Sequence, residues 1–378
     1  INEMDFKSAA QHVETPDDKS PMDVDPGTLV QEAQIATDKE HRMSLWQALK
    51  LYPKAIGWSV LISTAIVMEG YDVVLMGSFY GFPAFNQKYG HTLSDGSQGL
   101  SAAWQAGLSN AMNCGQILGL FANGIVSERF GYRKTMLGSL IATMAFIFIL
   151  FFAPNVETLL VGEILMGIPL GVYQTLSVTY ASEVCPVALR AYLTTYVNLC
   201  WVMGQLIASG VLKGLESRND EWAYRIPFAI QWIWPVPIFI GVLMAPESPW
   251  WLVRKGRLQE AVKSLTRLTS RGNTDFNAEE TVAMIIHTNE VEKQLNEGTS
   301  YFDCFRGTNL RRTEISCLIW AAQNLCGAGL MAYSTVFYQR AGLPVSQSFN
   351  MSLAQYAIGF FGTLFSWVLM SYLGRRTL

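Results

Sequence analysis

Charged residues are scarce in this sequence of 378 residues. Asp, Glu, Lys and Arg make up 15% of the chain, whereas hydrophobic residues make up 50%, and soluble domains contain about 25% charged residues. The six cysteines form no Cys-x-x-Cys pair and have no metal-ligand spacing, so we expect free thiols, no metal and no cofactor. They are Cys114, Cys185, Cys200, Cys304, Cys317 and Cys326.

Catalytic patterns are also missing. The sequence contains no pairing of a nucleophile with a base, no metal cluster and no phosphate-binding loop, which argues against an enzyme. We predict no nucleic-acid partner. Residues 1–45 have no apolar core run, which excludes a cleavable signal peptide there. Their ten acidic and four basic residues predict a disordered cytosolic tail.

Long apolar runs fill most of the remaining chain. A membrane-spanning helix needs roughly 20 such residues, and we count eight candidate spans. They are 55–80, 102–126, 134–153, 158–180, 190–212, 226–245, 314–338 and 348–371. The sixth contains Pro235 and Pro237, which predict a kink.

Basic residues predict the orientation of these spans. Ten Lys and Arg lie in 246–313, and the loops on the opposite side of the membrane contain few. The positive-inside rule then places the N-terminus and this segment in the cytosol. Apolar residues recur at helical spacing within 246–313, so it is predicted to form a small helical domain. The predicted divisions are a tail at 1–45, six spans at 46–246, a cytosolic linker domain at 247–312 and two further spans at 313–378.

A weak repeat supports two halves. The segment 127-SERFGYRK-134 follows the second span, and 371-SYLGRRTL-378 follows the eighth. Internal duplication of six-span halves is common in secondary transporters. The second half stops after two spans and the chain begins with Ile, so we expect a fragment of a protein with about twelve spans.

Two carboxylates lie within the first span. Glu69 and Asp72 are three residues apart, which places both on one helical face. Each costs roughly 2.5–3.5 kcal/mol at mid-membrane depth unless it lines a cavity or meets a partner. The pair therefore indicates a solute or proton pathway, with a neutral structural pair as the alternative.

Polar stripes accompany these carboxylates. Asn110, Asn113 and Gln116 follow helical spacing in the second span, and Gln323 and Asn324 lie in the seventh. Uncharged amides of this kind suit a neutral polyol. Hydrogen bonding between helices is the alternative explanation.

Five motifs occur in order along the spans. They are 69-EGYD-72, 128-ERFGYRK-134, 180-YASEVCPVALR-190, 246-PESPWWL-252 and 323-QNLCG-327. In these motifs the chain resembles the sugar porters of the major facilitator superfamily, and most closely the fungal maltose and alpha-glucoside permeases. The similarity covers about residues 45–378.

The resemblance implies an all-α membrane protein with the major facilitator fold, comprising a six-span half and the first two spans of a second half. It implies that a sugar such as maltose and a proton are moved together across a fungal plasma membrane by a monomer. A facilitator that moves sugar down its gradient and a non-transporting sugar sensor remain alternatives.

The resemblance also implies site residues. The expected proton carriers are Asp72, Glu69 and Glu163. The expected sugar contacts are Gln205, Gln323, Asn324, Glu69, Asn113 and Gln116. The expected cytosolic gate network is Glu128, Arg129, Arg133, Glu183, Arg190, Glu247 and Arg375. For its Arg residues, ordinary positive-inside topology is the alternative explanation.

Several positions depart from the family pattern. Trp250 stands where Arg is usual, which predicts the loss of a cytosolic ion pair. Glu163 stands where bacterial relatives have Arg, but it lies about six residues from the outer end of its span, so a structural role at the interface is an alternative. Gln116 replaces a Glu that the maltose-like permeases usually have, which favours the facilitator slightly.

Overall fold

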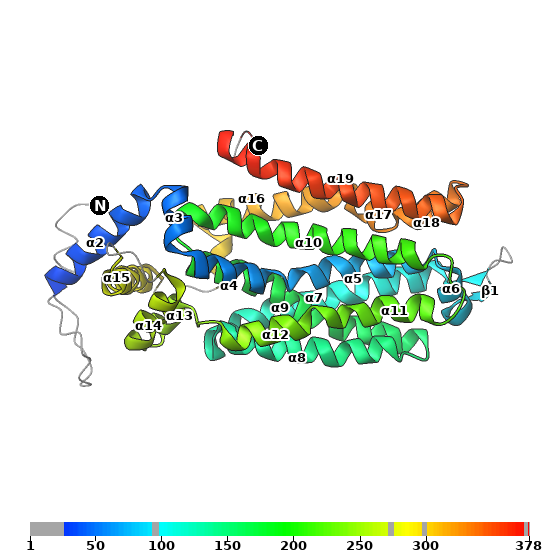
Figure 1. Ribbon diagram of the computed structural model, residues 1–378, viewed down its shortest axis with the longest axis horizontal. Coiled ribbons are helices and arrows are strands. Elements are labelled where there is room, and N and C mark those ends of the chain that lie inside the picture. Colours follow the sequence, from blue (N-terminus) through cyan, green and yellow to red (C-terminus); the bar gives the residue numbers. More distant parts are fainter. Residues whose placement is uncertain (1–25, 93–97, 271–275, 297–300, 374–376, 378) are drawn as a thin grey trace.

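The computed structural model describes residues 26–92, 98–270, 276–296, 301–373 and 377. Within these residues the chain is helical except for one short antiparallel pair, β1 (His91–Thr92) with β2 (Gln98–Gly99). The predicted all-α membrane fold is confirmed. Figure 1 shows a long bundle with a group of shorter helices at one end.

Six groups of helices form the bundle, and they follow the first six predicted spans. They are α4 (Pro53–Ser63) with α5 (Ile66–Phe79), α7 (Ala102–Phe130), α8 (Tyr132–Phe151), α9 (Val156–Val184), α10 (Val187–Leu215), and α11 (Trp222–Ile230) with η1 (Gln231–Ile233) and α12 (Pro235–Met244). The short α6 (Pro83–Tyr89) and the strand pair close the end that we call the loop end. The opposite end we call the linker end, and it carries α13 (Pro249–Arg254), α14 (Leu258–Leu268) and α15 (Ala278–Asn296).

Six helical segments are long and apolar enough to cross a membrane, within the described residues. They are Pro53–Phe79, Tyr132–Phe151, Val156–Val184, Val187–Leu215, Trp222–Met244 and Val345–Met370. The second predicted span forms α7, which has sufficient length, but its amides and glycines make it less apolar. The seventh is not one continuous helix.

Glycines allow the central helices to approach closely. A side-chain carbon at Gly70 of α5 would overlap the backbone of Trp201 on α10, and one at Gly204 of α10 would overlap the backbone of Val67. Gly115 of α7 and the facing residues of α9 form an equally close crossing. Small residues are what lets helix backbones touch inside a membrane, where helix association depends on packing. These crossings fix α5 and α9 at the centre of the bundle.

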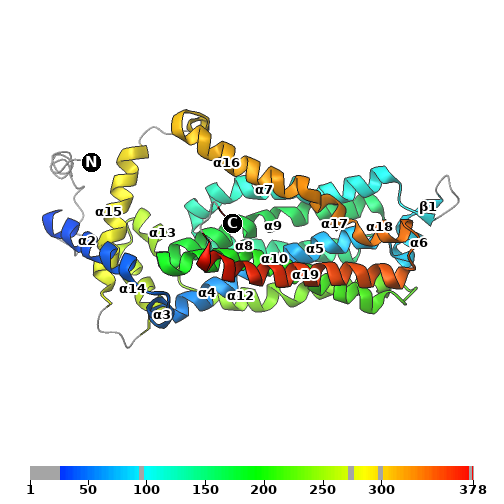
Figure 2. The same ribbon diagram turned by 90° about the horizontal axis from the view of Figure 1, so that it is seen from above.

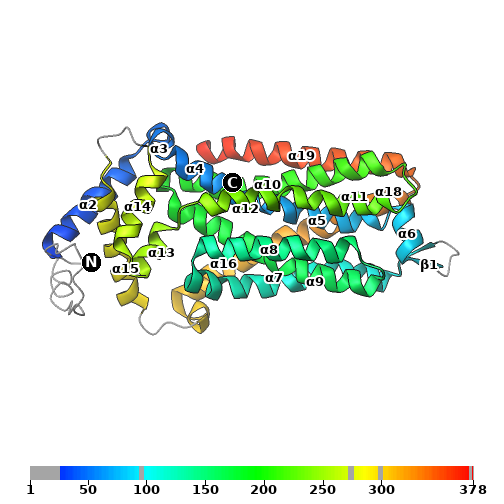
Figure 3. The same cartoon turned by 60° about the horizontal axis from the view of Figure 1, so that its bottom comes forward.

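The linker domain lies at one end, as Figure 3 shows for α13 (Pro249–Arg254), α14 (Leu258–Leu268) and α15 (Ala278–Asn296). The N-terminal helices α2 (Pro26–Arg42) and α3 (Leu45–Leu51) lie at the same end. The prediction of a disordered tail is therefore wrong for 26–42, and residues 1–25 lie outside the described part. The helix α2 packs on α15, and Lys39 forms an ion pair with Glu280 of α15 at 2.7 Å. This tertiary contact stabilises a segment whose polar composition is not sufficient for it to fold alone.

The remaining helices lie against one side of the bundle. They are η2 (Tyr301–Phe305), α16 (Gly307–Gln323), η3 (Asn324–Ala328), α17 (Gly329–Ala332), α18 (Ser334–Arg340) and α19 (Val345–Tyr372). The seventh predicted span is thus broken, and Gly327 adopts a φ of 111° within the break. Only glycine takes up this left-handed backbone conformation without strain.

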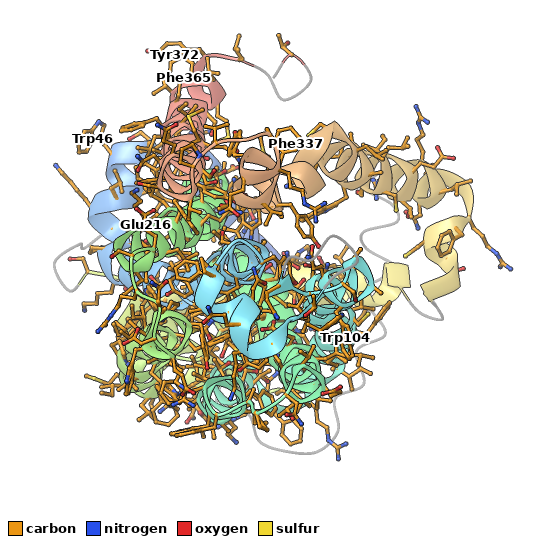
Figure 4. The ribbon with its side chains drawn as sticks, turned by 90° about the vertical axis from the view of Figure 1, so that its right-hand side faces the viewer. Trp46, Trp104, Glu216, Phe337, Phe365 and Tyr372 are labelled. Carbon is orange, nitrogen blue, oxygen red and sulfur yellow. The ribbon has the colours of Figure 1, made fainter. Side chains whose placement is uncertain are left out.

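The contact with the bundle is closest at the loop end. Figure 2 shows that α19 follows α10 and that α16 diverges from the bundle toward the linker end. No residue of α16 is buried. Figure 4, viewed from the loop end, shows Phe365 and Tyr372 of α19 directed away from the bundle.

Candidate functional site

The buried carboxyl groups lie between α5, α7, α9 and η1. Asp72 and Glu163 are each 0% exposed, and Glu69 is 4% exposed. Glu69 and Asp72 come from α5, as the sequence predicts, and Glu163 comes from α9. Glu163 is fully buried inside the bundle.

Asp72 has two polar neighbours. The side-chain amide of Gln231 donates a hydrogen bond to Asp72 Oδ1 at 2.6 Å. The carboxyl group of Glu163 also lies close to Asp72. Asp72 Oδ2 and both carboxyl oxygens of Glu163 are buried and have no hydrogen-bond partner among the described residues. Two carboxyl groups can bond to each other only when one carries a proton and donates it. The pair is therefore a candidate site for a proton.

Glu69 meets amides from two other helices. Its Oε1 accepts hydrogen bonds from Gln116 of α7 at 3.1 Å and from Gln174 of α9 at 3.4 Å. No Lys or Arg in the described ranges forms an ion pair with Glu69, Asp72 or Glu163. Among the described residues, the donors to Glu69 and Asp72 are neutral amides, which is suited to a site that binds polar, uncharged groups.

The other predicted sugar contacts do not converge. Gln205 is buried in α10, and Gln323 is exposed at the end of α16. Asn113 is exposed on α7, where its amide donates to the carbonyl of Ser109 at 3.4 Å. The side chain of Asn324 lies outside the described residues. The structure thus brings Glu69 and Gln116 together, and a sugar-binding role for the rest stays a prediction.

A second charged cluster lies at the linker end, and Arg254 of α13 is its centre. The Arg254 guanidinium donates to Glu183 Oε1 at 3.1 Å and forms an ion pair with Glu128 at 3.3 Å. Glu183 also accepts hydrogen bonds from Tyr132 and Ser248. Burial works against the charged form of Arg254, but the attraction of Glu183, Tyr132 and Glu128 outweighs it and raises the pKa of Arg254. The cluster joins α7, α9 and α13.

Arg254 lies one helical turn after Trp250 and forms ion pairs with Glu128 and Glu183. The loss of an ion pair at position 250 itself stays a prediction. Residues four apart share a helix face. Trp250 itself is half-buried and packs against the hydrophobic core.

Glu247 holds the start of α8. Its carboxylate accepts from the backbone N–H groups of Tyr132 at 2.9 Å, Arg133 at 3.2 Å and Ser248 at 3.3 Å. A carboxylate at a helix N-terminus satisfies free N–H groups and opposes the positive end of the helix dipole. Burial raises the pKa of Glu247, and these three N–H groups and the charge of Arg133 counteract that rise.

The remaining predicted gate residues have different contacts. The Arg133 guanidinium donates to the carbonyl of Leu243 at the end of α12. The Arg129 guanidinium lies over the ring of Phe130, 5.6 Å from its centroid. Neither Arg129 nor Arg190 forms an ion pair within the described ranges. Arg375 lies outside the described residues.

Comparison with known proteins identifies the architecture. The sugar (and other) transporter family matches residues 58–378. The chain belongs to this family.

Curated members include the general alpha-glucoside permease of Saccharomyces cerevisiae strain ATCC 204508 / S288c, which is 43% identical over 100% of this chain. The maltose permease MAL61 of the same species is 45% identical over 92% of this chain. The chain covers 62% of the first relative and 57% of the second. It therefore spans less than two thirds of the length of these relatives.

Solved structures agree on the fold. The proton:xylose symporter XylE bound to 6-bromo-6-deoxy-D-glucose superposes with a TM-score of 0.70, at 20% identity, over 86% of this chain and 71% of that chain. A partially occluded, inward-open XylE from E. coli gives 0.63, also at 20% identity, over 86% of this chain and 74% of that chain. At this identity the likeness supports the fold alone.

Sequence reasoning within this family missed three side chains. Gln231 lies in the short η1 turn between two proline-containing helices, and the kink predicted at Pro235 was the signal that could have found it. Gln174 lies on the same helix as Glu163, eleven residues later, and it was not predicted as a site residue. Arg254 was not predicted as a gate residue; it lies four residues after Trp250, where the motif differs.

Proposed function

We propose that this protein transports an alpha-glucoside such as maltose together with a proton. Alternating access moves the two halves of the transporter around a central site. Asp72 is the principal proton carrier, Glu163 shares its proton, and Glu69 accepts sugar hydroxyl groups. The transporter lies in a fungal plasma membrane as a monomer, with the N-terminus and linker end in the cytosol.

The contact between Asp72 and Glu163 carries this proposal. Both carboxyl groups are fully buried, and Asp72 Oδ2 and both Glu163 oxygens have no hydrogen-bond partner among the described residues. A hydrogen bond between the two groups requires a proton that either group can hold. A proton bound there from one side and released to the other couples transport to the proton gradient. The names of the curated relatives supply the substrate class, alpha-glucosides and maltose.

The linker-end cluster supplies a candidate gate. Arg254, Glu183 and Glu128 connect three helices at the end that we place in the cytosol. Ion pairs of this kind can form in one state of a transporter and separate in the other. In this proposal the cluster stabilises one conformation, and Glu247 fixes the α8 terminus beside it.

A facilitator is the second candidate. The neutral amide of Gln116 faces Glu69 at 3.1 Å, so this contact contains one titratable group and not two. Glu69 can then act in sugar binding without a proton cycle.

Uptake of labelled maltose separates these functions. The complete coding sequence that contains these residues is expressed in yeast without sugar permeases of its own, and uptake is followed at acid pH with and without a protonophore. We expect accumulation that the protonophore abolishes. We also expect Asp72→Asn to lose accumulation, and Asp220→Asn, an exposed control before α11, to retain it.

Equilibration that the protonophore leaves unchanged identifies the facilitator. Full accumulation by Asp72→Asn contradicts the assignment of the proton carrier. Absence of maltose entry refutes the substrate, and other sugars are then tested in the same cells.

A further inference from the structure

A groove of about 850 Å³ lies between α4 and α14, away from the carboxyl groups and the linker-end cluster. The helix α4 begins the first span, and α14 belongs to the linker domain. Figures 1 and 3 show the two helices next to each other where the bundle meets the linker domain. The groove therefore lies at the level where one face of the membrane meets the protein.

Basic side chains line the rim of this groove. Lys54 comes from the first turn of α4, and Lys263 and Arg267 come from α14. All three are exposed, and none of the described residues that line the groove is acidic. Lys54 and Lys263 form no ion pair within the described part of the chain. An uncompensated positive rim of this kind favours an anionic ligand.

Arg267 is held in place at this rim. Its guanidinium donates to the carbonyl of Met244, the last residue of α12, at 2.6 Å. Glu260, an acidic residue on the same helix, is paired with Arg257 at 2.6 Å and is therefore engaged elsewhere. The guanidinium has further N–H donors in a fixed planar arrangement, which matches the geometry of a phosphate.

The walls of the groove are apolar. Trp58 and Leu61 of α4 and Val262 of α14 line it. Gly57 contributes no side chain, and a carbon attached there would meet no atom within 4 Å. Leu61 packs against Gly241 of α12, which closes one side. A free phosphate would use only the rim, whereas a ligand with a charged head and an apolar body uses both surfaces.

We propose that this groove binds an anionic phospholipid of the adjacent leaflet. Its phosphate contacts Lys54, Lys263 and Arg267, and its glycerol and acyl groups lie against Trp58 and Leu61. Basic pockets beside membrane helices are suited to such headgroups. The bound lipid would connect the linker domain to the span that carries Glu69 and Asp72. The proposal does not depend on which sugar is transported.

Lipid binding to the purified chain tests this proposal. The chain is placed in nanodiscs of phosphatidylcholine containing increasing amounts of phosphatidylserine, and retained lipid is counted by native mass spectrometry. The double variant Lys54→Gln/Lys263→Gln removes two unpaired charges from the rim. We expect it to weaken phosphatidylserine retention at least tenfold. Lys134→Gln, which removes an exposed charge at the start of α8, is the control and should retain the lipid.

A second pair of variants tests the apolar wall without changing charge. Gly57→Leu places a side chain in the groove and should weaken retention at least fivefold. Gly138→Leu makes the same change at an exposed position of α8 with open space around it, and it should have no effect. Circular dichroism and size-exclusion chromatography check that every variant is folded.

Three results would overturn the proposal. One is equal retention by the double lysine variant and by the unmodified chain. Another is an equal loss with Lys134→Gln, since the effect would then be general attraction to positive charge. The third is displacement of phosphatidylserine by glycerophosphate at the lipid's own concentration, which would make the groove a site for soluble anions.

Discussion

At the scale of single residues, three buried acidic groups limit how this bundle can be built. An ionised carboxylate without a partner is far too costly inside a protein, so each group must be neutral or bound by donors. Glu69 Oε1 has two amide donors, and Asp72 Oδ1 has Gln231. The other oxygen of each group and both oxygens of Glu163 have no partner among the described residues, so these groups are accommodated when they carry a proton or bind a ligand.

The Glu163→Gln variant separates structure from proton transfer. The amide still donates to Asp72, so we expect a folded protein whose stability changes by about 1 kcal/mol or less. It cannot exchange a proton, and proton-driven accumulation should fall at least tenfold. Labelled-sugar uptake measures this, with Glu157→Gln, an exposed acid in the first turn of α9, as the control. Undiminished accumulation would show that Glu163 takes no part in coupling.

Arg254 allows a test of the linker-end cluster. Arg254→Gln leaves Glu183, whose side chain is 14% exposed, without its cation. Loss of a charged hydrogen-bond partner from a group this buried costs about 1–3 kcal/mol. The melting temperature in detergent should fall, and Arg257→Gln, whose partner Glu260 is exposed, should change it little.

The combined variant Arg254→Gln/Glu183→Gln completes this test. If the two residues stabilise the protein through each other, the double variant should be less destabilised than the two single effects added together. Additive losses would mean that Arg254 acts through other contacts.

At the scale of helices, glycine decides which elements can cross at close range. Gly70 and Gly204 let α5 and α10 meet backbone to backbone, and this crossing presses the segment that carries Glu69 and Asp72 into the bundle. Backbone atoms cannot move aside as a flexible side chain can. The position of the acidic residues therefore depends on glycines that have no chemistry of their own.

Gly70→Ala is predicted to destabilise the bundle strongly. The added methyl would overlap the carbonyl of Trp201, and overpacking of this kind costs about 1–3 kcal/mol or more. Folded yield after size-exclusion chromatography and the melting temperature should both fall. Gly210→Ala on α10, with no atom within 4 Å, is the matched control and should be neutral or slightly stabilising. Equal behaviour of the two variants would contradict the close crossing.

At the scale of the whole molecule, the later helices touch the bundle most closely at the loop end. Tyr333 donates to Ser109 of α7 at 2.7 Å and stacks with Tyr80, with ring centroids 5.9 Å apart. The side-chain amide of Gln339 in α18 donates to the carbonyl of Gly81 at 3.2 Å. No residue of α16 is buried. The contacts between the later helices and the bundle are therefore concentrated at the loop end.

A cross-link at the loop end tests whether α18 must separate from the Gly81 segment during transport. Gly81→Cys with Gln339→Cys, in a background where the exposed cysteines are serine, is joined by a short, reducible thiol cross-linker, because Gly81 contacts the far end of the Gln339 side chain. We expect the cross-linker to abolish sugar uptake and a reductant to restore it. Each single cysteine variant is the control and should be unaffected. Full uptake with the cross-link formed would mean that these two segments do not separate.

Sequence patterns were sufficient where the signal is local. Apolar runs placed the bundle helices, Pro235 indicated the break between α11 and α12, and spacing put Glu69 and Asp72 on one helix. They failed for α2, whose stability comes from packing on α15, and for the seventh span, where Gly327 adopts a backbone conformation that a hydropathy pattern does not reveal.

The sequence by itself determined the family, the membrane character and the presence of acidic residues in an apolar span, because composition and motifs record these directly. The tertiary structure decided that Glu163 lies close to Asp72, that Gln231 donates to Asp72, and that Arg254 pairs with Glu183. These pairs join residues 71 to 159 positions apart, and only the packing of helices brings them together.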